Sequence, residues 1–246
     1  MSETDYSKQY LCIICRKPDI VWLDFLKTFT QYKVYIVIDD NSIDYKDKYK
    51  AYDTINIIQV SNEECKKNGY IRLTYSFNNE VTGWDKALYY FSKLDTSYDT
   101  IWFIEDDVFF KNEETLVNID SKYTDHDLLS NRIISKEEQI ASGNKWHWFS
   151  IRIPISPPYY RCMCCAVRLS RTFISIIKKY VDKHNTLLFH EIMFPTLSIQ
   201  NKLINAVPDE LRNIYYRKNY KINDIDINSL YHPVKDMDEH IAFRLK

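Results

Sequence analysis

Three consecutive carboxylates, Glu105, Asp106 and Asp107, interrupt an apolar and aromatic run over residues 100–110 of this 246-residue chain. Side chains of a strand alternate between its two faces, so we expect Glu105 and Asp107 on one side and Asp106 on the other. Crowded carboxylates repel one another unless a cation or hydrogen-bond donors compensate, and oxygen ligands suit Mg²⁺ or Mn²⁺. The triplet therefore predicts a divalent-metal site, with a solvated acidic turn as the alternative.

A second acidic pair, Asp39 and Asp40, follows the apolar run 34–38, which is typical of a parallel strand covered on both faces. Residues 10–16 predict an earlier strand, with a helix between the two. Open α/β sheets bind ligands at the carboxyl ends of their strands. Asp39 and Asp40, together with Arg16 at the end of the first strand, are therefore candidate ligand contacts, and the family resemblance given below implies that this ligand is a nucleotide. An ordinary Asx turn is the alternative for the two acids.

The segment just before the acidic strand predicts a helix that begins near Gly83. A glycine beside a helix N-terminus lets backbone donors approach a phosphate or a sugar. Asp85 and Lys86 could hydrogen-bond such a ligand directly, and Trp84 is placed in the same candidate set. Helix capping by Asp85 with a surface ion pair explains the same residues equally well.

Two further candidates lie in the C-terminal half. Glu191 shortly precedes Pro195, a residue tolerated best in a helix's first turn, so Glu191 is expected at a helix start. The helix dipole favours its ionised form, while the neighbouring phenylalanines favour a raised pKa, so Glu191 is either a general base or a cap. His232 stands alone in a turn-like stretch, where it is either a ligand or a packing residue.

An aromatic segment lies between the predicted strands of the second half. Residues 131–159 lack a regular pattern and contain Trp146, His147 and Trp148. Long aromatic loops on a rigid scaffold are usually functional, and indole rings stack on sugar faces as well as they fill gaps. An acceptor platform, to which His190 is added, and a small loop-anchoring core remain equal alternatives.

Composition narrows the function classes. The 33 Lys and Arg balance 34 Asp and Glu, which argues against a nucleic-acid partner. The three glycines cannot build a Walker loop or a G-x-G-x-x-G turn. No apolar stretch matches a signal-peptide core or a membrane span, so a cytoplasmic, reducing location is expected. The six cysteines are expected to be reduced core thiols, with a zinc site joining the two cysteine groups as the less favoured alternative.

Taken together, the acids after the second and fourth strands, the helix start at Gly83, Glu191 and His232 resemble the GT-A family of nucleotide-sugar glycosyltransferases. The segment 168–171 before a helix is similar to members from giant viruses and protists. The resemblance implies one α/β domain with a Rossmann-like mixed sheet flanked by helices. It also implies a nucleotide-sugar-binding half over residues 1–110 and an acceptor-binding half over residues 111–246.

The same resemblance implies roles for individual residues. The D-x-D-like triplet would bind Mn²⁺ or Mg²⁺ through Asp107, with Glu105 at the metal or the ribose, although Glu departs from the family pattern there. His232 would complete the metal site, and Glu191 would act as the base of an inverting enzyme. The donor would be a UDP-sugar, and the acceptor a glycan, glycolipid or protein. A sugar nucleotidyltransferase and a non-catalytic carbohydrate-binding domain are the alternatives.

Overall fold

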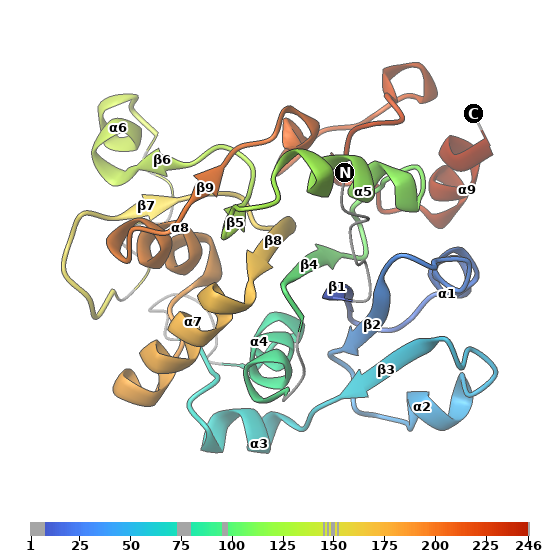
Figure 1. Ribbon diagram of the computed structural model, residues 1–246, viewed down its shortest axis with the longest axis horizontal. Helices are drawn as coiled ribbons and strands as arrows, with labels where there is room; N and C mark the ends of the chain where they lie inside the picture. Colours follow the sequence, from blue (N-terminus) through green and yellow to red (C-terminus); the bar gives the residue numbers. More distant parts are fainter. Residues whose placement is uncertain are drawn as a thin grey trace.

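A mixed sheet forms the centre of the protein (Figure 1). The computed structural model describes residues 8–72, 80–94, 98–144, 146, 148, 151 and 153–245. Within these ranges, seven strands follow the order β3-β2-β1-β4-β8-β5-β9. They are β1 (Gln9–Cys15), β2 (Lys33–Ile38), β3 (Ile55–Gln59), β4 (Thr100–Glu105), β5 (Leu128–Leu129), β8 (Ala166–Ser170) and β9 (Asn205–Ala206). β8 pairs antiparallel with both of its neighbours, and the other pairings are parallel.

Helices cover both faces of this sheet, so the predicted mixed α/β architecture is confirmed. They are α1 (Ile20–Leu26), α2 (Tyr45–Lys48), α3 (Asn62–Lys67), α4 (Gly83–Lys93), α5 (Glu113–Lys122), α6 (Lys136–Ala141), α7 (Arg171–His184), α8 (His190–Gln200) and α9 (Met237–Leu245). β1 alternates its side chains: Cys12 packs with α4, α7 and α8, whereas Cys15 packs with α1 and α5. Both faces of β1 are therefore buried against helices.

Two small additional sheets complete the C-terminal half. One pairs β6 (Ile134–Ser135) with β7 (Tyr160–Arg161), and the other pairs β10 (Asn213–Ile214) with β11 (Tyr231–His232). Local capping explains where several helices begin. Asn112 and Ser170 accept hydrogen bonds from backbone N–H groups in the first turns of α5 and α7, as short polar side chains do at these positions.

The structure corrects four sequence-based expectations. The acidic strand ends at Glu105, so the strand alternation expected for the triplet does not extend to Asp106 and Asp107. The segment expected as one strand over 160–167 is divided between β7 and β8, because its middle turns to contact the start of α8. The stretch 131–159, expected to be irregular, contains β6 and α6, whose capping box joins Ser135 and Glu138. Pro195 lies inside α8 rather than in its first turn.

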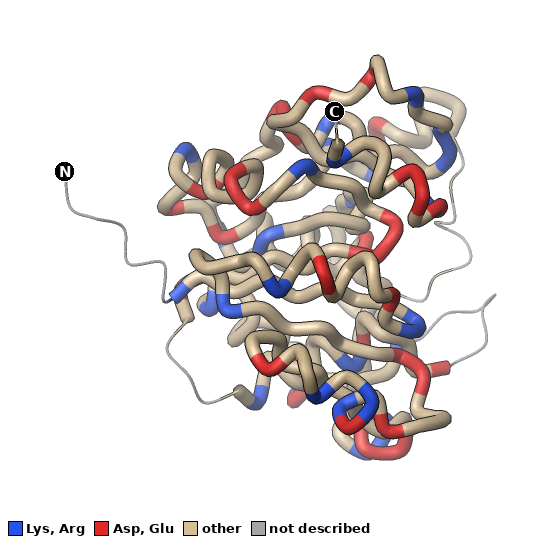
Figure 2. The backbone as a smooth tube through the Cα atoms, turned by 90° about the vertical axis from the view of Figure 1, so that its right-hand side faces the viewer, with Lys and Arg blue, Asp and Glu red and all other residues tan. Residues whose placement is uncertain are grey.

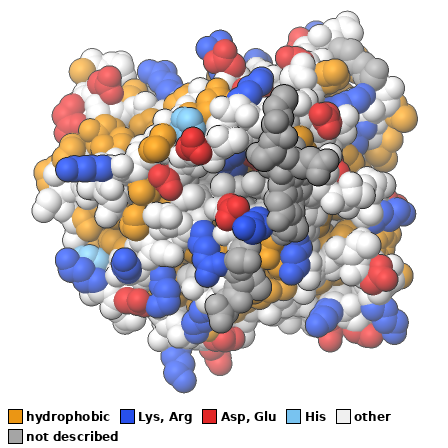
Figure 3. Space-filling model, in the orientation of Figure 1, with side chains coloured by type: hydrophobic (Ala, Val, Ile, Leu, Met, Phe, Trp, Pro, Cys, Tyr) orange, Lys and Arg blue, Asp and Glu red, His pale blue; other side chains and the backbone are white. Residues whose placement is uncertain are grey.

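Acidic and basic residues intermingle along the chain and on the surface, in agreement with the balanced composition (Figures 2 and 3). Across the described ranges, no helix has the length and apolar character that crossing a bilayer requires. All six cysteines are described, and each is a buried, free thiol. All six fit the expectation of core thiols, and Cys165 also belongs to the site described next.

Candidate active site

The main sheet has one point at which its strand order reverses. β1 is followed in the chain by β2 on one side, whereas β4 flanks β1 on the other, so the reversal lies between β1 and β4. Ligands of open α/β sheets bind outside the carboxyl ends of the strands at such a point. A cavity of about 250 Å³ lies there, which we call the switch-point cavity. Its polar lining residues are Arg16, Asp39, Glu105, Asp106 and Asp107.

The N-terminus of α4 is packed closely against this cavity because its first residue is glycine. A Cβ atom on Gly83 would lie 2.7 Å from the side chain of Ile14, so any other residue would force Ile14 or the start of α4 to shift. Thr82 caps α4 together with Asp85, whose carboxylate accepts the Thr82 N–H at 2.7 Å. Burial raises the pKa of Asp85 to about 6. Asp85 is therefore a helix-capping residue, which was the alternative interpretation, and it does not line the switch-point cavity.

The two acids after β2 have different environments. Asp39 lines the switch-point cavity and pairs with the fully buried Lys86, Nζ to Oδ1 at 3.1 Å. The ammonium group of Lys86 therefore binds Asp39 in the protein interior and does not face a ligand. Asp40 accepts hydrogen bonds from Ser42 and Tyr45 at 2.6 Å each, and these bonds lower its pKa to about 2. Of the two predicted contacts, Asp39 is the one that faces the cavity.

The acidic triplet is fixed largely through its backbone. The Asp106 N–H donates to Ile14 of β1 at 3.1 Å, and its carbonyl accepts the Trp22 indole N–H at 2.8 Å. The Glu105 carboxylate accepts the Trp84 indole N–H at 2.6 Å, which gives Trp84 a definite role at the site. Burial, with the charges of Asp107 and Glu105, raises the pKa of Asp106 to about 7. The cavity is therefore strongly acidic and lacks sufficient positive charge of its own.

His232 meets this acidic group from the C-terminal segment. β11 carries it, and its Nδ1 donates to the Tyr215 carbonyl at 2.5 Å, which directs Nε2 toward the Asp107 carboxylate. Nε2 and Asp107 Oδ1 are 3.3 Å apart, without the alignment of a hydrogen bond. Burial lowers the pKa of His232, but Asp107 and the Tyr215 carbonyl raise it more, so the net shift is upward.

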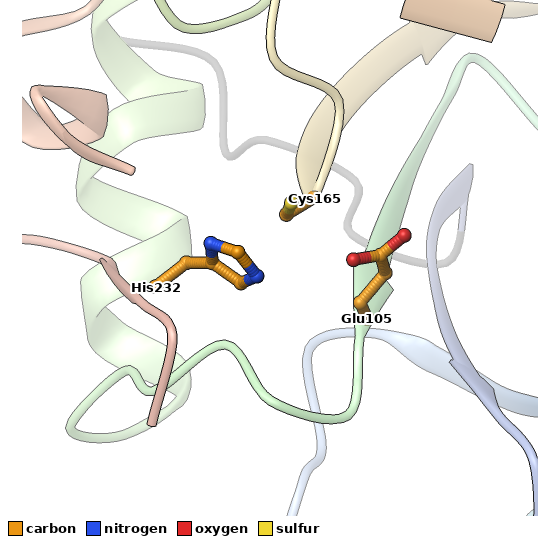
Figure 4. A group of neighbouring side chains, drawn as sticks. All are labelled: Glu105, Cys165 and His232. Carbon is orange, nitrogen blue, oxygen red and sulfur yellow. The ribbon is translucent and has the colours of Figure 1, made fainter. Parts of the chain in front are cut away.

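A metal ion fits the donor set formed here. Glu105, Cys165 and His232 offer ligand atoms within 4.8 Å of one another, from β4, the start of β8 and β11 (Figure 4). Asp107 Oδ1 is buried, and its nearest charged neighbour among the described ion pairs is His232 Nε2, 3.3 Å away and poorly aligned, an arrangement that a solvated turn does not explain. A carbonyl-oriented histidine beside carboxylates is the usual arrangement of a metal ligand. Cys165 was not among the predicted ligands.

Glu191 lies where two further cavities meet. It lines a central cavity of about 400 Å³, shared with Asp107 and His232, and also a pocket of about 610 Å³ on its other side. Pro195 lacks the N–H that would bond the Glu191 carbonyl within α8, and this carbonyl accepts the Cys162 N–H at 3.0 Å instead. Burial raises the pKa of Glu191 to about 7, with Arg161 and His232 opposing this shift and Glu105 adding to it.

The predicted acceptor residues divide into two groups. Trp146 lines the 610 Å³ pocket. His190 lines the central cavity and stacks on Trp84 with ring centroids 4.7 Å apart, and burial lowers its pKa to about 3. Trp148 is buried and donates to the Gln139 side chain at 3.1 Å, so it anchors the segment instead of facing a ligand. His147 lies outside the described residues.

The segment 168–171 has a structural role at the opposite end of β8. Arg168 is buried and donates to the Asp120 carboxylate at 2.7 Å, which also accepts the Trp102 indole N–H. Ser170 caps α7. These contacts explain the segment by packing and place it away from the cavities.

Comparisons with known proteins find distant likenesses in structure. No protein-family model and no curated protein matches the chain. The chain is similar to 4-diphosphocytidyl-2C-methyl-D-erythritol synthase from Anaerococcus prevotii, with 10% identity, TM-score 0.49 and coverage of 99% of this chain and 98% of that one. It is also similar to the galactosyltransferase LgtC, solved with donor and acceptor sugar analogues, with 8% identity, TM-score 0.49 and coverage of 96% and 95%.

A third similar structure is mouse xyloside xylosyltransferase 1, with 11% identity, TM-score 0.42 and coverage of 82% and 85%. At such scores these likenesses carry no argument about activity and give no support to a viral origin. The chemistry must follow from the side chains of the cavities themselves.

Proposed function

We propose that this protein is a metal-dependent glycosyltransferase of the GT-A type that uses a nucleotide-diphosphate sugar, with UDP as the favoured nucleotide. One observation carries the proposal: Asp39, Glu105, Asp106 and Asp107 line a cavity at the switch point of the sheet, and His232 approaches Asp107 there. Such a cavity repels a diphosphate unless a cation accompanies it. The nucleotide would lie in the N-terminal half, near Arg16, Asp39 and the start of α4.

Asp107, His232 and Glu105 are the proposed metal ligands, with Cys165 as a fourth donor. An imidazole beside carboxylates suits Mn²⁺ better than Mg²⁺, which is usually held by oxygen ligands alone, whereas ligation by the Cys165 sulfur would favour a softer ion such as Zn²⁺. A divalent ion bound there would supply the positive charge that the leaving diphosphate requires. The Trp84 indole fixes the Glu105 carboxylate, and the Tyr215 carbonyl fixes the tautomer of His232. Both metal-binding side chains are therefore oriented before a metal ion binds.

Glu191 is the proposed general base. Its carboxylate lines both the central cavity and the neighbouring pocket, so an acceptor hydroxyl in that pocket can lie against it. The acceptor oxygen bonds to the anomeric carbon while the bond from that carbon to the diphosphate oxygen breaks. The electron pair leaves with the diphosphate, and the hydroxyl proton passes to Glu191. In-line attack inverts the anomeric centre.

Cys165→Ser tests the sulfur ligand independently of turnover. Because a cysteine binds metal as the thiolate, Co²⁺ binding by the wild-type protein is expected to produce a sulfur-to-cobalt charge-transfer band and to release a proton. The variant is expected to bind Co²⁺ without this band. Cys164→Ser, which changes a buried neighbouring thiol, serves as the control and should keep the band. A wild-type spectrum without the band would contradict ligation by Cys165.

The proposed activity is tested by incubating the protein with Mn²⁺ and a panel of UDP- and GDP-sugars without acceptor. We expect one donor to be hydrolysed slowly, with release of the nucleoside diphosphate, because water can replace the acceptor hydroxyl. Pyrophosphate release from a nucleoside triphosphate and a sugar phosphate would instead establish nucleotidyl transfer. Binding of a nucleotide sugar without any turnover, even with acceptors supplied, would favour the non-catalytic alternative.

A further inference from the structure

The 610 Å³ pocket beyond Glu191 contains two arginines, Arg72 and Arg161, and we call it the arginine pocket. Its other polar or aromatic lining residues include Asn144, Trp146, Phe189 and Tyr216. Glu191 is the one acidic residue in this lining. The arginine pocket is therefore positively charged, whereas the switch-point cavity on the metal side is negatively charged.

Both guanidinium groups are held in place without an acidic partner. Arg72 Cζ lies 5.5 Å from the centroid of the Phe189 ring, and Arg161 Cζ lies 4.6 Å from that of Trp146. The Nε atom of each is buried and has no hydrogen-bond partner among the described residues. Buried Arg168, by contrast, pairs with Asp120. Stacking on a ring leaves the edge of a guanidinium free to bind a planar anion.

Each arginine has a backbone pairing that helps to place it. Arg161 belongs to β7 and pairs with Ile134 of β6. Arg72 forms a parallel bridge with Leu187, whose N–H donates to the Ile71 carbonyl at 2.9 Å. Both arginines are half-buried, and a buried Nε–H without a partner is costly unless a ligand completes its hydrogen bond. Two such groups facing one cavity indicate a binding site for an anion.

We propose that the arginine pocket binds an acceptor sugar that carries a carboxylate or a phosphate group. This inference rests on the proposed function, because it takes the hydroxyl next to Glu191 as the reacting group. Asp39, Glu105 and Asp107 do not line this pocket, and Arg161 and Trp146 do not line the central cavity, although Arg72 lines both. Arg161 therefore lies on the acceptor side of Glu191, away from the place proposed for the donor diphosphate. Arg161 and Arg72 bind the anionic group, and Trp146, which stacks on Arg161, orients that guanidinium.

Binding of simple sugars to the metal-free protein tests this proposal without any turnover. The probes are D-glucuronate for a carboxylate, D-glucose 6-phosphate for a phosphate and D-glucose as the neutral reference, each measured by titration calorimetry. We expect at least one anionic sugar to bind about tenfold or more tightly than glucose, the effect of one charge-assisted hydrogen bond. The anion that shows this preference identifies the acceptor class.

Arg161→Gln is expected to remove this preference, with the affinity for UDP and Mn²⁺ unchanged. Arg72→Gln is expected to remove it as well, but Arg72 also lines the central cavity, so its UDP affinity is not part of the test. Arg212→Gln, at an exposed arginine paired with Asp209, is the matched control and should keep it. Thermal melting of each variant checks that it is folded. If one variant does not fold, the other arginine variant still tests the proposal. Equal binding of charged and neutral sugars, or an unchanged preference in both folded variants, would overturn the proposal. Loss of UDP binding in folded Arg161→Gln would also overturn it, whereas absence of UDP binding by the wild-type protein would count against the proposed function.

Discussion

Replacing Glu191 with Gln is expected to lower the rate of sugar transfer by about 100- to 10,000-fold, the contribution of a positioned general base. The amide keeps the size of the side chain but cannot accept the acceptor's proton. Affinity for the nucleotide sugar should remain within a few-fold of the wild type, because Glu191 does not line the switch-point cavity. Steady-state rates and calorimetry with the donor check the two effects. Glu137→Gln, at an exposed position of α6, is the control.

The pH dependence of the wild-type rate provides a second measure of the same group. A base must be deprotonated to act, and burial raises the pKa of Glu191 to about 7. The rate is therefore expected to fall as the pH decreases through about 7, or through a lower value once a bound cation favours the carboxylate. The Gln variant should lack this dependence. Near wild-type activity in that variant, or retention of the anomeric configuration by NMR, would contradict the base assignment.

Asp107→Asn is expected to reduce metal-dependent transfer by more than about 100-fold, which exceeds the effect of losing an outer partner of a metal ligand. The amide of Asn binds divalent ions more weakly than a carboxylate and removes one negative charge from beside His232. Activity should recover partly at high Mn²⁺ concentration if the loss lies in metal affinity. Mn²⁺ titrations of the variant and the wild type, followed by product formation, measure this shift.

Asp99→Asn is the control for this variant, because Asp99 is exposed and precedes the opposite end of β4. It should leave the Mn²⁺ dependence unchanged. If Asp107→Asn behaved like this control, Asp107 would belong to an acidic turn of no functional consequence, and the metal site would be wrong.

The sheet was predictable from the sequence because its strands are short, apolar runs that end at charged residues. β2 ends before Asp39, and β4 ends at Glu105. Those ends place acids at the carboxyl edge of the sheet, where a ligand site is expected. The predicted single strand over 160–167 failed because hydrophobicity alone does not distinguish a strand from a buried connection.

The sequence did not predict which acidic side chains face the cavity and which are bound by neighbouring groups. Asp85 and Asp39 have equally polar neighbours in the chain, but Asp85 meets the N–H of its own helix cap while Asp39 meets Lys86. Asp40 is likewise bound by Ser42 and Tyr45. Whether an acid is available to a ligand depends on these partners, and they are set by packing.

Cys165, Arg72 and Arg161 were missed for a related reason. Cys165 comes near Glu105 only because β8 runs antiparallel beside β4, a pairing between residues far apart in the chain. Arg72 and Arg161 come from different segments and share one pocket. A local signal was present for Cys165, which directly precedes β8 and is one of three closely spaced cysteines, but nothing in that spacing indicates His232.

The most direct test of the central claim is calorimetric titration of the wild-type protein with UDP in the presence and absence of Mn²⁺. The acidic switch-point cavity predicts that UDP binds weakly without the ion and at least about tenfold more tightly with it, because the cation offsets the repulsion between the carboxylates and the diphosphate. UDP binding that is independent of Mn²⁺, or no UDP binding under either condition, would contradict a metal-assisted nucleotide-sugar site with UDP as its nucleotide.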